Sequence, residues 1–376
     1  MLFSNNKPAR KVFTVILLYL VPFLSFSQSI NDYRSVGNGN WTNVSIWETY
    51  NGTAWVVAAN YPGQVAGTNN VFIEGGFSVT ISSNIPNNFN SLTIGPGELL
   101  VSSNSSLDTP LITLISGGSA EWTSNNTTLS LPANASVIIA GGNLVEANPC
   151  NATKRLSIGG VIYATCNGGG PGVDYDFGDI NTGGGTLTVS PTSNSPLCIG
   201  ETLNLLANPA GAGSNETMTT FSWSGTGPGG YTFNSSVQDP IINTTLLNAG
   251  TYAFMVTITD PNSNTNTNTV DIIITASPNA PVSNGNQRIC IGGTIPALTV
   301  TVGAGETVDW YDTASGGNLI LSDNTSYTPV VAGSYFAEAR NTSAGCTSTT
   351  RTEVVLNISS CKVVTNRRIS FRVRRN

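Results

Sequence analysis

The length and composition of this chain indicate an all-β protein of several modules and exclude common catalytic classes. It has 376 residues, 40 of them glycine, and only 10% are charged. It contains no histidine, which removes Ser-His and Cys-His catalysis and the usual zinc sites. Gly, Asn and Ser suit tight turns, whereas Val, Ile and Thr fill strands, and no helical periodicity follows residue 27.

Charge is distributed unevenly along the chain. Residues 28–361 hold 6 basic and 21 acidic residues, so their net charge is 6 − 21 = −15. Residues 362–376 hold six basic residues and no acidic one. Because an acidic body repels nucleic acid and anionic lipid, we expect no nucleic-acid partner.

The first 27 residues read as a signal peptide. Lys7, Arg10 and Lys11 precede an apolar run over residues 12–26, and Ser25 and Ser27 form a small-x-small cleavage signal. The run is shorter than the ~20 residues that span a bilayer, and no later segment could span one as a helix. We therefore predict a secreted protein, extracellular or at the outer cell surface.

A strand, Gly-Gly turn, strand unit recurs through residues 28–190. The steps between the second glycines of successive copies are 21, 21, 24, 18 and 24 residues. This spacing predicts a right-handed β-solenoid with one turn per repeat and glycine at the corners. The alternative is a run of ordinary hairpins in a sandwich. The glycines counted are Gly76, Gly97, Gly118, Gly142, Gly160 and Gly184.

Three tryptophans, Trp41, Trp47 and Trp55, come just before the first repeat. A solenoid needs its open ends covered, so we interpret them as an N-terminal cap. The functional alternative is a glycan-binding platform, since indole faces stack on pyranose rings.

Residues 36–165 resemble the glycine-rich β-helix modules of secreted Bacteroidetes proteins. The resemblance rests on Trp41-x(5)-Trp47, then Pro62-Gly63 and Val71-x-Ile73-x-Gly75-Gly76. It implies a non-catalytic module.

Residues 191–277 and 278–360 each carry the landmarks of an immunoglobulin-like (Ig-like) sandwich. A cysteine begins the second strand, a tryptophan marks the third, and a Gly-x-Tyr segment marks the corner before the sixth. Phe254 and Ala337 stand where antibody domains place their second cysteine. The landmarks are Cys198, Trp223 and Tyr252 in the first domain, and Cys290, Trp310 and Tyr335 in the second.

Six cysteines in an exported chain imply disulfides. Cys346 follows the sixth strand of the last domain in a hairpin, and we predict that it bonds to Cys290. Cys150 and Cys166 flank the fifth glycine repeat and form a second expected pair. Cys198 and Cys361 have no assigned partner.

The last domain closely resembles the Ig-like domain of Bacteroidetes surface proteins. The match rests on Cys290-Ile-Gly-Gly, Trp310-Tyr-Asp with Gly316-Gly317, Ser326-Tyr-Thr-Pro, Gly333-Ser-Tyr335 and Gly345-Cys346. Residues 191–277 resemble the looser domain of polycystic-kidney-disease repeats. Such domains imply spacing, adhesion or carriage of another module rather than chemistry.

One acidic loop is the candidate site for chemistry. Asp174, Asp176 and Asp179 lie between glycine triplets, and three carboxylates on such a loop could hold Ca²⁺. They could also imitate the paired acids of a glycoside hydrolase. A solvated linker loop is the simplest interpretation, and no other cofactor is expected.

Residues 361–376 form a basic tail in which residues 369–374 alternate as one strand. This tail either docks on the last sandwich or holds the protein at the outer surface. Taken together, the sequence predicts a non-enzymatic, adhesin-like or structural protein that binds, or is spaced against, glycans or other cell-surface components. The alternative is a β-helix polysaccharide lyase or glycoside hydrolase with Ig-like spacers.

Overall fold

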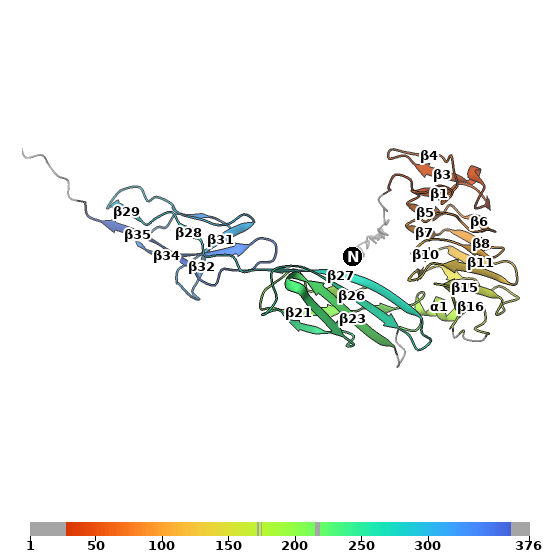
Figure 1. Cartoon of the computed structure of the whole chain (residues 1–376). Helices are drawn as coiled ribbons and strands as arrows, with labels where there is room; N and C mark the ends of the chain where they lie inside the picture. The colour runs from red at the N-terminus through yellow and green to blue at the C-terminus, as the bar shows by residue number, and fades with distance from the viewer. Residues whose placement is uncertain (1–27, 171–172, 174, 215–218, 362–376) are drawn as a thin grey trace, which may run out of the picture.

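The computed structural model describes residues 28–170, 173, 175–214 and 219–361. The predicted signal peptide and residues 362–376 of the basic tail lie outside these ranges. The described chain is almost entirely β and forms three bodies in a row, a solenoid followed by a first and a second sandwich (Figure 1). Within the described ranges, no helix is long and apolar enough to cross a membrane.

The solenoid consists of three sheets in which successive turns of the chain stack in parallel. Val71 lies opposite Leu92, Leu92 opposite Ile112, and Ile112 opposite Val137. All four are buried, because alternate side chains of each strand point into the interior. The predicted β-solenoid is therefore confirmed.

The strands of these sheets are as follows, in spatial order. The seven-stranded sheet contains β13 (Ser136–Ala140), β10 (Leu111–Ile115), β7 (Ser91–Ile94), β5 (Asn70–Ile73), β1 (Tyr33–Ser35), β3 (Trp47–Tyr50) and β4 (Trp55–Val57). The second contains β14 (Asn143–Leu144), β11 (Gly118–Trp122), β8 (Gly97–Val101), β6 (Phe77–Ile81) and β2 (Gly39–Asn40). The third contains β17 (Tyr175–Asp176), β16 (Val161–Thr165), β15 (Lys154–Ile158), β12 (Thr127–Leu131) and β9 (Ser105–Ser106).

Glycine is required at one corner of the stack. Gly97 lies opposite Gly118, and the register of the next turn places Gly142 in the same column. A Cβ on Gly118 would lie 2.0 Å from the carbonyl oxygen of Ile94, and one on Gly142 would lie 2.5 Å from that of Gly118. Neighbouring turns could not approach so closely with a larger residue at either position.

Two of the six predicted repeats are not turns of the solenoid. Gly159 and Gly160, at φ 61° and 85°, form the turn of a hairpin in which β16 runs antiparallel to β15. Gly184, at φ 80°, ends the helix α1 (Phe177–Gly183). A pair of glycines serves a hairpin or a helix end as well as a solenoid corner, so spacing alone could not separate them.

Both ends of the parallel stack are covered. At the C-terminal end, Phe177 of α1 packs on Trp122, with ring centroids 4.6 Å apart. At the N-terminal end lie the 3₁₀ turn η1 (Val44–Ile46) and two buried tryptophans. Solenoids need such covers because their terminal turns would otherwise expose the apolar interior.

The two sandwiches repeat one plan, a three-stranded sheet facing a five-stranded sheet. The first contains β19 (Thr192–Ser193), β21 (Thr202–Leu206) and β25 (Ile241–Asn243) facing β20 (Leu197–Cys198), β27 (Thr265–Thr275), β26 (Gly250–Thr259), β23 (Thr220–Gly227) and β24 (Tyr231–Ser235), with the short turn η2 (Pro228–Gly230). The second contains β28 (Val282–Ser283), β30 (Leu298–Thr301) and β33 (Ser326–Tyr327) facing β29 (Gln287–Cys290), β35 (Thr352–Ser359), β34 (Gly333–Asn341), β31 (Glu306–Tyr311) and β32 (Leu319–Leu321). A separate two-stranded antiparallel ladder pairs β18 (Thr188–Val189), which precedes the first sandwich, with β22 (Pro209–Ala210), which follows β21.

The predicted tryptophan and tyrosine landmarks hold in both sandwiches, whereas Cys198 and Cys290 each end a strand instead of beginning one. Trp223 and Trp310 are buried on the third strands, and each indole N–H donates to a backbone carbonyl. The hydroxyl of Tyr252 donates to the carbonyl of Asn248 at 2.8 Å, and that of Tyr335 donates to Val331 at 2.9 Å. Both are tyrosine corners, which tie the sixth strand to the chain just before it.

Candidate functional site

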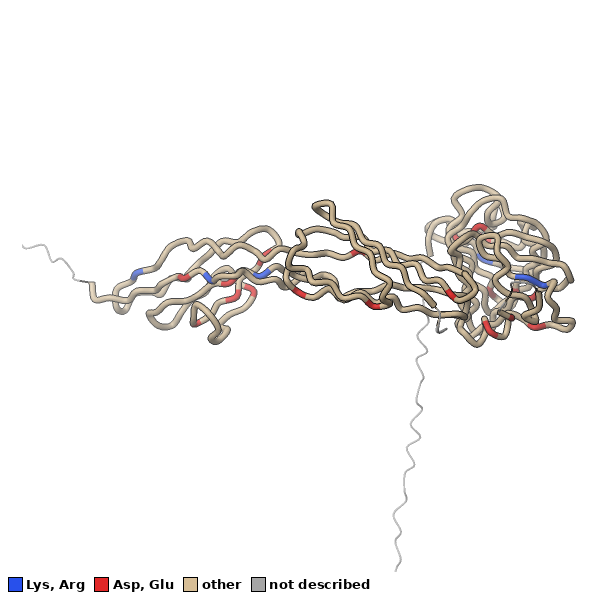
Figure 2. Tube along the Cα trace, turned by 60° about the horizontal axis from the view of Figure 1, so that its bottom comes forward, with Lys and Arg blue, Asp and Glu red and all other residues tan. Residues whose placement is uncertain are grey.

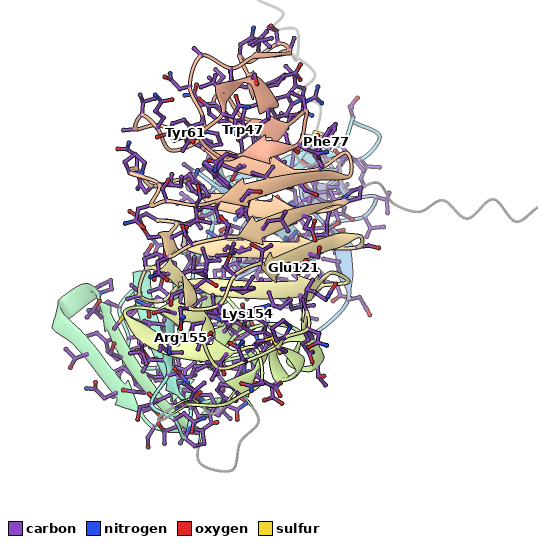
Figure 3. All side chains as sticks on the ribbon, turned by 90° about the vertical axis from the view of Figure 1, so that its right-hand side faces the viewer. Trp47, Tyr61, Phe77, Glu121, Lys154 and Arg155 are labelled. Atoms are coloured by element: carbon purple, nitrogen blue, oxygen red, sulfur yellow. A yellow bond between two sulfur atoms is a disulfide. The ribbon has the colours of Figure 1, made fainter. Side chains whose placement is uncertain are left out.

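The tryptophans proposed as a sugar platform are mostly part of the core. Trp41 and Trp47 are fully buried, and their indole N–H groups donate to the carbonyls of Pro62 (2.9 Å) and Trp41 (2.8 Å). Figure 3 shows Trp47 at the N-terminal end of the stack. Neither ring can stack on a ligand, so the glycan assignment is wrong for these two residues. Large apolar rings gain more free energy by closing the open end of the solenoid.

Trp55 is in a different position. It lies on the edge strand β4 and is partly exposed, with the Arg34 guanidinium 4.7 Å from its ring centroid. Arg34 is itself paired with Glu48 at 2.7 Å. One indole face is therefore engaged in a cation–π contact, and glycan binding at Trp55 stays a prediction.

The acidic loop forms a helix cap. The Asp176 carboxylate accepts from the backbone N–H of Asp179 at 2.7 Å, and the Asp179 carboxylate accepts from that of Asp176 at 3.0 Å. This capping box starts α1, as expected for carboxylates at a helix N-terminus. Asp174 lies outside the described residues, and the described ones contain no cluster of three His, Cys, Asp or Glu suited to a metal. The calcium site stays a prediction.

The cysteine pairing agrees with one of the two predicted bonds, and it also pairs the two cysteines that had no assigned partner. Cys150 is bonded to Cys166, as expected. The predicted Cys290–Cys346 bond is wrong, because Cys290 is bonded to Cys361 and Cys346 to Cys198.

The sheet register gives the physical reason for this pairing. Strand β29 runs parallel to β35, with Cys290 opposite Ser359, so Cys361 lies just beyond the end of the same strand pair. Cys346 lies before the start of β35, whose 8 residues span roughly 25 Å. A disulfide cannot bridge that length, since its Cα atoms lie within about 7 Å.

The Cys198–Cys346 bond forms a covalent joint between the two sandwiches. Cys198 ends β20 of the first sandwich, and Cys346 lies between β34 and β35 of the second, with the two Cα atoms 5.6 Å apart. The bond spans 148 residues of chain. It gives the sandwiches a second connection besides the polypeptide between β27 and β28.

The solenoid and the first sandwich meet through a buried polar joint. The Tyr163 hydroxyl donates to the carbonyl of Ala212 (3.1 Å) and accepts from the N–H of Leu187 (2.7 Å). Its ring stacks on Tyr175, whose hydroxyl donates to the buried Asp260 carboxylate at 3.0 Å. Burial raises the pKa of Tyr163 far above its ordinary value, so this hydroxyl keeps its proton.

Asp260 begins the turn between β26 and β27 and is fully hydrogen-bonded. Its carboxylate also accepts from the N–H groups of Asn262 and Asn264 and from the Asn264 side chain, at 2.8–2.9 Å. Buried charges are stable only when paired in this way. One continuous cluster of buried apolar residues runs from the solenoid through this joint into the first sandwich, whereas the second sandwich has its own.

A cleft of about 140 Å³ opens beside this joint. Asn134 and Ser263 line it with positive φ of 62° and 68°, and Val161 beside them is exposed. The walls are turns of the solenoid and of the β26–β27 hairpin. None of the described residues that line this cleft is charged.

Several solved structures are similar to this chain. Murine CEACAM1b is 17% identical with a TM-score of 0.27, covering 46% of this chain and 99% of that one. Fibronectin(III)-like modules of Clostridium thermocellum CbhA are 13% identical with a TM-score of 0.28, covering 48% and 100%. A 1.5-MDa bacterial ice-binding adhesin is 14% identical with a TM-score of 0.28, covering 46% and 64%. None of the curated proteins matches the chain.

One family model matches part of the chain. It is described as an Ig-like domain, CHU_C associated, and it matches residues 278–359. This confirms the Ig-like character that the motifs of the last domain predicted.

Proposed function

We propose that this protein is a non-catalytic extracellular scaffold, in which the two sandwiches hold the solenoid at a fixed distance and angle. The Cys198–Cys346 bond carries the proposal, because a flexible linker would need no second connection between neighbouring modules. The shared core at the other joint supports it in the same way.

Further support comes from location and chemistry. Three disulfides fit an oxidising, extracellular compartment. The alternative hydrolytic function would use the acidic loop that contains Asp176 and Asp179. Both carboxylates instead form the capping box of α1. Adhesion to glycans or other surface components remains part of the proposal.

Small-angle X-ray scattering of the purified full chain tests the scaffold role. Wild type should give one narrow distribution of interatomic distances with a large maximum distance, as expected for a rigid elongated particle. Cys198→Ser/Cys346→Ser should broaden that distribution, because the joint can then hinge. Cys290→Ser/Cys361→Ser is the matched control, since it removes a disulfide within one sandwich and should leave the joint unchanged. An unchanged profile for the first variant would contradict the proposal.

A further inference from the structure

The outer face of the five-stranded sheet in the first sandwich is covered with hydroxyl groups. Strand alternation sends Trp223, Phe254 and Ile258 inward, so the residues between them point outward. The register aligns the outward residues of β23, β26 and β27 in rows. One row is Thr220, Thr259 and Thr265, and the next is Ser222, Thr257 and Thr267. We call these two rows, with Ser224 and Thr269 of the following row, the hydroxyl face.

The rows are spaced regularly. Adjacent strands lie about 4.8 Å apart, and outward residues along one strand are separated by roughly 6.7 Å. The hydroxyls of Thr257 and Thr267 are close enough to bond across the strands, at 2.8 Å. The face therefore presents a grid of groups that each donate and accept hydrogen bonds.

This face is almost without charge. Strands β23, β24, β26 and β27 contain one charged residue, Asp271. Residues 191–277 contain no lysine or arginine, and Figure 2 shows no blue on the central sandwich. The corresponding strands of the second sandwich carry five charged residues, Glu306, Asp309, Glu338, Arg340 and Glu353.

The difference in outer-face composition between the two sandwiches shows that strand propensity alone does not explain the hydroxyl face. Threonine favours strands by its branched side chain, and that preference acts equally on both sandwiches. Yet the second sandwich uses ion pairs such as Arg340–Asp309, at 2.7 Å, where the first has hydroxyls. Strand propensity alone does not produce this difference.

A shallow depression of about 230 Å³ lies at the edge of the hydroxyl face, beside Ser224 and Thr269. Ser224, Thr226 and Thr269 provide hydroxyls around it, and Ala253 and Met255 provide apolar surface. Met255 is 43% exposed, so its side chain offers apolar contact surface in the depression. The depression thus combines hydroxyl groups with a small apolar contact.

We propose that the hydroxyl face binds a neutral, hydroxyl-rich polysaccharide. Such a chain offers hydroxyls that match the rows, and the C–H face of a sugar ring suits Met255 and Ala253. The net charge of −15 over residues 28–361 opposes anionic polymers. This inference rests on the glycan adhesion included in the proposed function and names its surface, whereas the scaffold role requires no ligand, so either can fail without the other.

Affinity electrophoresis of the full chain tests the inference, with dextran, mannan or arabinoxylan as neutral polymers and alginate or polygalacturonate as anionic ones. At least one neutral polymer should retard the protein, and neither anionic polymer should. Ser224→Ala/Thr226→Val/Thr269→Val removes three hydroxyls and keeps strand propensity. It should weaken binding ~10-fold or more, because each lost hydroxyl removes a hydrogen bond to the polymer.

Thr93→Val/Thr113→Val is the matched control, because these threonines are neighbours in register on the seven-stranded sheet of the solenoid. It should leave the affinity unchanged. Both variants should have the melting temperature of wild type, which shows that they fold normally. Absence of retardation by every neutral polymer overturns the inference, and so does a loss of binding in the solenoid variant alone.

Discussion

Tyr163 shows how much one buried hydroxyl contributes at a joint between modules. It comes from the last strand pair of the solenoid and bonds to backbone groups of Leu187 and Ala212. Those groups are buried, so without the hydroxyl they would remain unpaired. An unpaired buried group costs more free energy than a hydrogen bond gains, which makes this contact a sensitive point.

Tyr163→Phe should lower the free energy of unfolding by about 1–3 kcal/mol, measured by urea denaturation at pH 7. The control is Tyr61→Phe on a half-buried tyrosine at the other end of the solenoid, which should change stability little. Equal stability of wild type and Tyr163→Phe would show that water replaces the hydroxyl.

The raised pKa of Tyr163 adds a pH dependence to this comparison. Burial keeps the Tyr163 phenol protonated in the folded protein. The same phenol ionises in the unfolded chain as the pH passes about 10. The stability due to the neutral phenol is therefore present below pH 10 and decreases above it. The difference between wild type and Tyr163→Phe should shrink between pH 10 and 11.

At the scale of an element, the turn of the solenoid depends on a glycine column. Gly97, Gly118 and Gly142 let the backbone of one turn contact the next, while the strands on either side carry the buried apolar residues. The apolar pattern specifies the strands, and the glycines specify how closely they stack.

Gly118→Ala should destabilise the protein by about 3 kcal/mol or more, because the new Cβ would lie 2.0 Å from a backbone oxygen that cannot move alone. Gly76→Ala is the matched control. Its φ is 76° and nothing lies within 4 Å of its Cβ position, so only backbone strain of about 1–2 kcal/mol applies. Thermal unfolding followed by circular dichroism measures both, and an equal cost for the two would refute the close-packing argument.

At the scale of the whole molecule, the two joints differ in kind. The solenoid and the first sandwich share a continuous core, and the second sandwich has a separate one linked through Cys198–Cys346. Domains that share a core unfold together, whereas domains joined by a linker and one cross-link need not.

Calorimetry of Cys198→Ser/Cys346→Ser should therefore show two transitions, one for the solenoid with the first sandwich and one for the second sandwich. Adding Tyr163→Phe should lower the first transition by roughly 2–4 °C per kcal/mol and leave the second in place. Three transitions would contradict the shared core, and a shift of both would contradict the independence of the second sandwich.

Much of this architecture could be predicted from local patterns. Glycine spacing and alternation indicated the solenoid, and Trp223, Trp310 and the two Gly-x-Tyr corners indicated the sandwiches, because these features arise from contacts between residues close in sequence or in adjacent turns. The same patterns could not tell a solenoid corner from the Gly159–Gly160 hairpin, since both use glycine at positive φ.

The disulfide pairing at the joints and the surface of the candidate site could be determined only from the tertiary structure. Six cysteines allow fifteen pairings, and only the parallel register of β29 on β35 brings Cys290 to Cys361 and leaves Cys346 for Cys198. The burial of Trp41 and the rows of the hydroxyl face likewise depend on which strands become neighbours. Composition and periodicity determine what each strand buries, but pairing between distant strands determines what the assembled surface presents.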